Sequence, residues 1–145
     1  MSRTAGIPFL PRKGILAIAA VVDIALHDGD HPVSAKTLAV RHGLPPRHLE
    51  PVLQALVREG VLKGIRGPGG GYELASEPHD ITVEQILRAA ELIDEDPAPQ
   101  SHSPLLADIV LPAVASAEKA LSDALSRITI AEMVRPVERR RATGN

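Results

Sequence analysis

Residues 66–74, Arg-Gly-Pro-Gly-Gly-Gly-Tyr-Glu-Leu, decide the fold of this chain. Pro68 and three consecutive glycines lie between two short apolar segments, 61–65 and 72–75, which are typical of β-strands. Glycine adopts backbone conformations that other residues avoid, so this composition predicts a tight turn that comes close to another backbone. We therefore expect a β-hairpin with its tip at 67–71 and an arginine, Arg66, beside the tip.

Two helical segments precede the hairpin. Ser34 is a favourable N-cap for a short helix over 35–42, and Gly43 suits the left-handed residue that ends it. After a turn, apolar residues recur at helical spacing until Gly60, at Leu49, Val52, Leu53, Leu56 and Val57. Helix, turn, helix and hairpin in this order predict a mainly α fold of the winged helix-turn-helix class, in which the hairpin is the wing.

Pro51 conflicts with a regular second helix. A proline inside a helix loses one hydrogen bond and clashes with the carbonyl of residue 47, at a cost of about 3 kcal/mol. The helix is therefore either kinked at Pro51 or begins near Glu50, with residues 46–49 as a looser turn. We favour the later start, because three prolines then lie near the beginning of the helix.

Further segments flank these elements. Residues 1–11 are expected to form an arm, and residues 14–26 form a helix that is apolar on almost every side except at Asp23. Such a helix is buried on more than one face, so we expect it to pack against the helix-turn-helix and a second surface such as a partner subunit. Thr82 and Gln85 form a capping box that opens a helix ending near Glu91. The winged domain is thus expected over 12–92.

The rest of the chain predicts a dimerisation segment over 104–135. An acidic loop at 93–103 precedes a long helix that runs to about Arg127 and could bend at Pro112. Because this helix has more apolar surface than a small domain can cover, we favour a homodimer interface over the alternative that it folds back on its own core. The expected dimerisation residues are Leu106, Val110, Ala113, Ala117, Leu121, Ala124 and Ile128.

The end of the chain is expected to add little structure. Thr129 and Glu132 predict one more short helix, and residues 136–145 are expected to form a frayed, flexible tail.

Composition excludes several classes of protein. Of the 145 residues, only 1% are aromatic, which argues against single-strand nucleic-acid binding by base stacking. The absence of cysteine excludes disulfides and thiolate-bound zinc or iron–sulfur clusters. No apolar segment approaches the length of a membrane span, and the short apolar run after Lys13 does not suit an export signal. We expect a cytoplasmic protein without a membrane partner.

Charge is unevenly distributed along the chain. Residues 1–75 carry nine Lys and Arg against six Asp and Glu, a net of +3, and residues 76–145 carry seven against twelve, a net of −5, which together give the overall −2. A basic half and an acidic half would orient the molecule on a polyanion. Ordinary scatter on a surface explains a difference of this size equally simply.

The chain resembles the Rrf2 family of bacterial transcription regulators. The matching stretches are Ala-Leu-His at 25–27, residues 49–56, Gly-Val-Leu at 60–62, the hairpin at 66–74 and Ile-Thr-Val at 81–83. The resemblance extends from about Lys13 to Thr129 and implies a homodimer whose long C-terminal helix crosses to its mate. It also implies binding to a near-palindromic operator, usually as a repressor, with 47–58 as the recognition segment and Arg66 in the wing.

The chain departs from this family in one respect. Many relatives hold an iron–sulfur cluster with three cysteines in the loop before the long helix, and the corresponding loop at 94–103 contains none. We therefore expect a regulator without a cofactor. Its effector, if there is one, is an unidentified small molecule or protein.

Candidate DNA contacts divide by chemistry. Lys13, Ser34, Lys36 and Arg41 are expected to contact phosphates, whereas Arg47 can pair with guanine and Gln54 with adenine. Arg66 is expected to enter the minor groove, and Tyr72 to anchor the wing in the core. Glu50 either accepts a hydrogen bond from cytosine or stabilises the helix dipole. The full predicted DNA-binding set is Lys13, Ser34, Lys36, Arg41, Arg47, His48, Glu50, Gln54, Arg58, Arg66, Gly69 and Gly70.

Other functions are less well supported. No Gly-Lys-Ser/Thr follows the glycines, so they are not a nucleotide-triphosphate loop, and no catalytic constellation is found. His27, His31 and Asp30 could gather a metal ion, but a solvated turn is the simpler interpretation, and His102 in the acidic loop is equally weak. A winged-helix module for protein assembly, with no DNA role, remains the main alternative.

Overall fold

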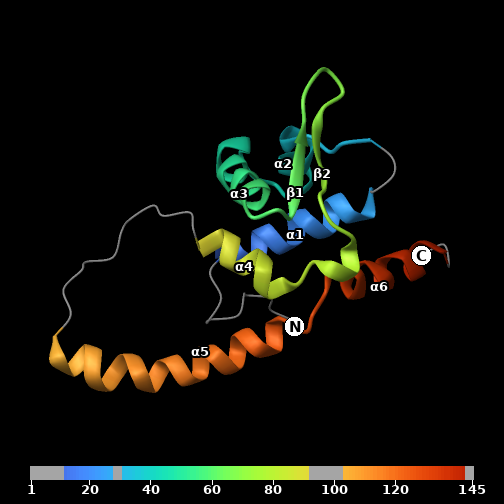
Figure 1. Ribbon diagram of the computed structural model, residues 1–145. Coiled ribbons are helices and arrows are strands. Elements are labelled where there is room, and N and C mark those ends of the chain that lie inside the picture. The colour runs from blue at the N-terminus through green and yellow to red at the C-terminus, as the bar shows by residue number, and fades with distance from the viewer. Residues whose placement is uncertain (1–11, 28–30, 92–102, 143–145) are drawn as a thin grey trace.

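The computed structural model describes residues 12–27, 31–91 and 103–142. In these residues the chain is mostly helical with one two-stranded antiparallel hairpin, as the sequence predicts (Figure 1). None of the described helices is both long and apolar enough to cross a bilayer. The elements are α1 (Arg12–Leu26), α2 (Ala35–Arg41), α3 (Pro46–Arg58), β1 (Leu62–Ile65), β2 (Gly71–Leu74), the 3₁₀ turn η1 (Pro78–Asp80), α4 (Val83–Glu91), the π-helical turn η2 (Leu106–Val110), α5 (Leu111–Leu125) and α6 (Ile130–Ala142).

Helix α1 is the centre of the core. It contacts α3, α4, α6 and β2, and Ala17, Ala20 and Val21 are completely buried. The small alanines allow neighbouring helices to approach closely and bring many atoms into contact. The expectation that α1 is buried on more than one face is confirmed, and α4 and α6 of the same chain, not a partner subunit, cover the second face.

The start of α3 corrects one prediction. The helix begins at Pro46 and contains Pro51, so the favoured start near Glu50 is wrong. Leu49 explains the difference, because its side chain is completely buried and holds the first turn against the core. Pro51 lies on the exposed side, where the carbonyl that loses its hydrogen bond can be solvated. Burial of Leu49 therefore outweighs the local penalty at Pro51.

The hairpin follows α3 directly. Strands β1 and β2 pair in the register Leu62↔Leu74 to Ile65↔Gly71, with Lys63 opposite Glu73. Leu62 and Leu74 are buried at the base, whereas the far end projects from the body (Figure 1). The base of the hairpin is thus part of the core, and the tip is free to reach a partner.

The segment after α5 returns to the domain through backbone pairing. The N–H of Val83 donates to the carbonyl of Ile128 at 2.9 Å, and the N–H of Ile130 donates to the carbonyl of Ile81 at the same distance. Thr82 caps α4 as predicted, because its hydroxyl accepts from the N–H of Gln85 at 3.1 Å. Ile128 therefore lies beyond the end of α5, and its placement on the stripe of the long helix is wrong.

Helix α5 extends away from the rest of the molecule (Figure 1). None of its residues is buried, so the alternative that it folds back over its own core is not observed. The π-helical turn η2 precedes it, and the N–H of Leu111 bonds to the carbonyl of Leu106. The irregular turn thus lies just before Pro112, where the sequence suggested a bend, and α5 ends at Leu125, two residues earlier than expected.

Helix α6 is longer than predicted. It has 13 residues and includes 136–142, which were expected to belong to a flexible tail. Ile130 and Val134 are buried against the core, and α6 packs along α1 and η1. This anchoring in the first turns lets the helix continue through Arg139, Arg140 and Arg141, whose positive charges suit a helix C-terminus.

Candidate nucleic-acid interface

Helix α3 separates its side chains into a buried and an exposed face. Leu49, Val52, Leu53, Ala55 and Leu56 are buried. The opposite face exposes the predicted contact residues, Arg47, His48, Glu50, Gln54 and Arg58, together with Pro51. This polar face is held rigidly because the apolar face is part of the core.

The hairpin is attached to the helix-turn-helix by backbone hydrogen bonds. The N–H of Tyr72 donates to the carbonyl of Val33 at 2.8 Å, and the N–H of Val33 donates to the carbonyl of Tyr72 at 3.0 Å. Gly71 permits this contact, because a Cβ there would lie 2.5 Å from the Val33 carbonyl oxygen. The predicted close approach of a glycine to another backbone is therefore confirmed. It fixes the wing beside the start of α2.

Glycine is also required inside the tip. Gly67 has a φ of +105°, and a Cβ on Gly70 would lie 2.1 Å from the carbonyl oxygen of Ile65. The N–H of Gly70 donates to the carbonyl of Gly67 at 2.9 Å and closes the turn. Gly69 is exposed with open space around it, so a side chain would fit there. Gly70 is thus a structural residue of the tip, and the direct DNA contacts predicted for Gly69 and Gly70 stay predictions.

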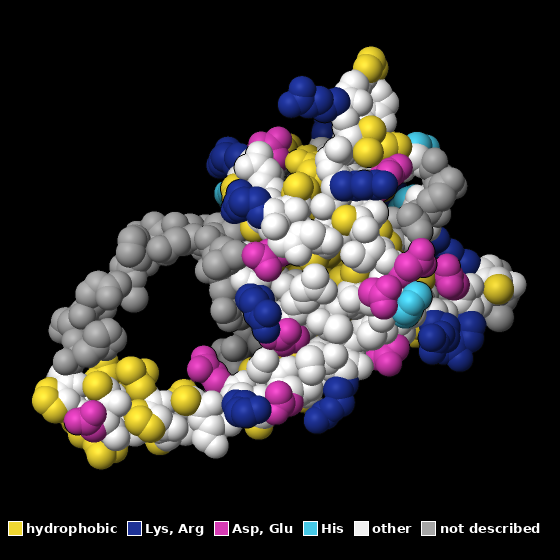
Figure 2. Space-filling model, viewed as in Figure 1, with side chains coloured by type: hydrophobic (Ala, Val, Ile, Leu, Met, Phe, Trp, Pro, Cys, Tyr) yellow, Lys and Arg dark blue, Asp and Glu magenta, His cyan; other side chains and the backbone are white. Residues whose placement is uncertain are grey.

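Arginines of α3 and the wing lie at the surface. Arg47, Arg58 and Arg66 are all exposed, and within the described ranges none has an ion-pair or hydrogen-bond partner. Figure 2 shows Lys and Arg side chains around the hairpin and the helices beside it. Their donors are therefore available to an external anion.

Tyr72 of the wing lies within the electrostatic influence of Glu50 on α3. Tyr72 packs against the core, as predicted. Burial raises the pKa of its hydroxyl above the ordinary value of 10.0, and the negative charge of Glu50 raises it further. Glu50 is the fifth residue of α3, beyond the first turn in which a carboxylate stabilises the helix dipole. The dipole interpretation of Glu50 is therefore not supported.

The predicted phosphate contacts have different surroundings. Lys36 is exposed on α2, and Lys13 is half-buried in the first turn of α1. Ser34 caps α2 as predicted: its hydroxyl accepts from the N–H of Thr37 at 3.0 Å and donates to the Thr37 hydroxyl at 2.9 Å. Gly43 has the left-handed φ of 65° that was predicted for the end of α2. Ser34 is thus engaged within its own helix, and its phosphate role stays a prediction.

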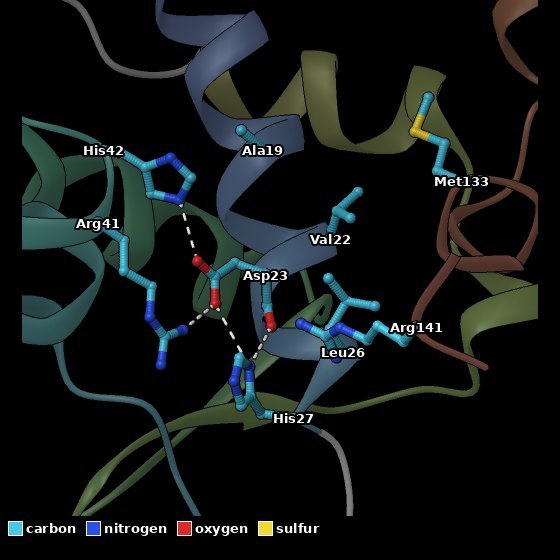
Figure 3. A pocket seen from close by; sticks show the side chains of 9 residues that line it. All are labelled: Ala19, Val22, Asp23, Leu26, His27, Arg41, His42, Met133 and Arg141. Atoms are coloured by element: carbon cyan, nitrogen blue, oxygen red, sulfur yellow. Dashed lines mark hydrogen bonds and ion pairs between the residues drawn. The ribbon is translucent and has the colours of Figure 1, made fainter. Parts of the chain in front are cut away.

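Arg41 belongs to a cluster that the sequence analysis missed. Its Nη1 pairs with Asp23 Oδ1, and His42 Nε2 lies 3.1 Å from Asp23 Oδ2 (Figure 3). His27 Nδ1 lies 2.8 Å from the backbone carbonyl of Asp23 and 3.4 Å from Oδ1. The acid in an otherwise apolar helix was a visible signal, but its partners lie 18 and 19 residues away. A phosphate contact by Arg41 would have to use its remaining donors.

The described residues do not form a metal site. No group of three or more His, Cys, Asp or Glu side chains in this part of the chain is placed to hold an ion. Asp30 and residues 93–102, which include His102, lie outside the described residues, as does the arm at 1–11.

Comparison with known proteins identifies the family. The Rrf2 model, described as an iron-dependent transcriptional regulator, matches residues 10–136. The chain is a member of the Rrf2 family. It is 37% identical over 82 residues to the HTH-type transcriptional regulator IscR of Photobacterium profundum, a match that covers 57% of this chain and 48% of that protein. It spans about half the length of the curated relatives that it matches.

Solved structures show the same fold. T. potens IscR is 33% identical with a TM-score of 0.68, and the match covers 88% of this chain and 87% of that one. CymR of B. subtilis, titled the global cysteine regulator, is 26% identical with a TM-score of 0.66, covering 91% and 98%. These relatives are named as regulators and not as enzymes, in agreement with the prediction that the chain has no catalytic site.

The iron in the family description does not fit this chain. The sequence has no cysteine, so no thiolate can hold an iron–sulfur cluster. The cluster of Asp23, His27, Arg41 and His42 does not provide an alternative iron site. The Asp23 carboxylate, which a metal ion would need as a ligand, is paired with the guanidinium of Arg41.

Proposed function

We propose that this Rrf2 member is a homodimeric, sequence-specific DNA-binding transcription regulator that acts as a repressor without an iron–sulfur cluster. The observation that carries the proposal is the exposed polar face of α3 beside the Arg66 tip. The same helix buries Leu49, Val52, Leu53, Ala55 and Leu56 of its apolar face, so the polar face is held in position for an external partner.

The chemistry of this surface suits double-stranded DNA. Arg47 and Gln54 lie on the exposed face of α3, where arginine can pair with guanine and glutamine with adenine in the major groove. Glu50 offers an acceptor for cytosine N4 on the same face. Arg66, beside the glycine tip, would enter the adjacent minor groove, whose negative potential attracts arginine when the groove is narrow.

Further positive groups would supply affinity that does not depend on sequence. Lys36, His48 and Arg58 are exposed around the same elements and would contact phosphates. Lys13 and the remaining donors of Arg41 would add to these contacts. Every phosphate neutralised in this way makes binding weaker at high salt.

Helix α5 supports the dimer. Large apolar side chains along η2 and α5 are exposed, among them Leu105 at 65%, Ile109 at 62% and Val114 at 52%. Figure 2 shows hydrophobic side chains gathered on the surface at the far end of this rod. An apolar surface of this kind usually marks an interface.

The predicted stripe is directed away from the parent domain. Ser122 of α5 donates to Glu84 of α4 at 3.3 Å, which defines the side that faces the domain. Ala117 lies five residues earlier, about 140° around the helix at 3.6 residues per turn. Ala113, Leu121 and Ala124 of α5 share its side, so a second copy can pack there, and Leu106 and Val110 of the π-helical turn η2 would extend this surface. Two recognition helices would then reach half-sites about 34 Å apart.

DNA binding to the promoter region of the protein's own gene tests the proposal. Fluorescence anisotropy would compare this duplex with a scrambled duplex at two salt concentrations. We expect tight, salt-sensitive binding that prefers the promoter duplex. Equal, weak binding to both duplexes would instead support a winged-helix module for protein assembly.

A further inference from the structure

We propose that a surface hollow between α1, α2 and α6 binds a small carboxylic acid with an apolar body, and that its occupancy changes DNA affinity. The second half of this statement rests on the proposed function. The hollow has a volume of about 540 Å³, which lies within the range of small-molecule sites. Its lining includes Arg41 and His42 at the end of α2, where both contact Asp23 of α1, and no residue of α3.

The hollow combines apolar and positive walls. Ala19, Val22 and Leu26 of α1 and Met133 of α6 supply the apolar walls. Figure 3 shows Arg141 entering from α6 near Leu26, with the cluster around Asp23 beside it. An alkyl or aromatic group would cover the apolar walls, while an acid group at its end would meet the positive side chains.

Charge favours an anion over a cation. The Asp23 side chain is only 10% exposed, because Arg41, His27 and His42 cover it. These three partners are 38%, 25% and 26% exposed, so the acid lies behind them and Arg41 presents its remaining N–H donors and its positive charge at the surface.

Arg141 adds a second guanidinium. It is exposed and has no partner in the described part of the chain. Two arginines therefore face the hollow against one carboxylate that is already engaged. A ligand carboxylate would balance this excess and can bind a guanidinium through two parallel hydrogen bonds.

The position of the hollow explains how a ligand would act. Arg41 and His42 end α2, the first helix of the helix-turn-helix, and both hold α2 to Asp23 of α1. A carboxylate that competes for the donors of Arg41 would loosen this connection and shift α2. A ligand that also contacts Met133 and Arg141 would couple the shift to α6, which packs along α1.

Calorimetric titration of the full chain without DNA tests the site. The probes are octanoate, octanamide, which has the same body without the charge, and acetate, which has the charge without the body. We expect saturable binding of octanoate and binding of the other two at least about tenfold weaker. Octanamide lacks the charge-assisted hydrogen bond, and acetate lacks the alkyl chain that covers the apolar walls; either loss is expected to exceed the change in free energy that corresponds to tenfold. Equal binding of octanoate and octanamide, or no saturable binding of octanoate, would overturn the proposal.

Two variants locate the ligand. Arg141→Ala should weaken octanoate binding about tenfold or more, whereas Arg139→Ala on the same exposed helix end should leave it unchanged. Equal affinities in the two variants would place the ligand elsewhere and refute the site. Circular dichroism confirms that both variants fold.

DNA affinity separates the two halves of the proposal. Octanoate should change the affinity of the wild type for its operator and should have at least about tenfold less influence on the Arg141→Ala variant. Octanoate binding without any change in DNA affinity would refute the regulatory role alone. Failure of the protein to bind DNA at all would refute the proposed function, while the calorimetric result would still decide whether the site exists.

Discussion

Helices α3 and α5 use their apolar residues in opposite ways. Five residues of α3 are buried in the core of their own chain, whereas no residue of α5 is buried. Helix α3 therefore presents a polar face to its surroundings, and α5 presents an apolar one. The difference is the basis for the proposal that a second copy covers α5, whereas α3 is packed within its own chain and exposes polar side chains that could recognise DNA.

The comparison predicts a large difference in stability between equivalent truncations. Leu53→Ala in α3 should lower the free energy of unfolding by about 2–5 kcal/mol, because Leu53 is completely buried and its loss leaves a cavity. Leu105→Ala, just before η2, should change it by less than about 0.5 kcal/mol, because Leu105 is 65% exposed. Urea denaturation would measure both, in a chain carrying Ala117→Asp so that dimerisation does not contribute.

A charge on the apolar side of α5 should break the dimer without unfolding the chain. Ala117→Asp should weaken dimerisation about 100-fold, because burying an unpaired carboxylate costs at least a few kcal/mol, and 1.4 kcal/mol is tenfold. Lys119→Asp adds the same carboxylate on the other side of α5, where Lys119 pairs with Asp123 in solvent, and should leave the dimer intact. Sedimentation equilibrium measures both; equal dissociation constants would exclude this side of α5 as the interface.

The exposed face of α3 should determine base preference. Arg47→Ala should relax discrimination at a symmetric pair of operator positions by about 1–3 kcal/mol, because the bidentate contact to guanine is lost. Selection from random DNA would reveal the change. Arg88→Ala, on α4 and paired with Glu84, is the matched control. Identical preferences in wild type and Arg47→Ala would remove Arg47 from base recognition.

Replacement of the wing arginine should have the smallest effect on DNA affinity, and this effect should not depend on the DNA sequence. Arg66→Ala should weaken binding to specific and random DNA alike and reduce the slope of log affinity against log salt by about 0.9. Arg139→Ala on α6 should leave the slope unchanged. A salt titration in which Arg66→Ala retains the wild-type slope would contradict insertion of the wing into the groove.

The sequence correctly predicted those elements of the fold that are determined by residues close together in the chain. The apolar spacing of α3 reflects burial of one helix face, and Ser34 reflects the need to cap a free N–H at the start of α2. The glycines of the hairpin reflect backbone conformations and close contacts that exclude a Cβ. The hairpin also identified the family, because its glycines have structural roles that few other residues can take.

Tertiary contacts explain the predictions that failed. The start of α3 depends on burial of Leu49, which no local penalty at Pro51 can reveal. Helix α6 has only two buried residues, Ile130 and Val134, so its apolar pattern was too sparse to predict its length. The Asp23 cluster joins α1 to the end of α2, and the sequence gives no measure of that distance.

The central claim is that two copies, joined through α5, place two recognition helices on one duplex. Native mass spectrometry of the protein with a duplex obtained by selection from random DNA tests it most directly. We expect two chains on each duplex for the wild type, and loss of this complex for Ala117→Asp at the same concentration. A complex with one chain per duplex, or an undiminished two-chain complex in Ala117→Asp, would contradict it.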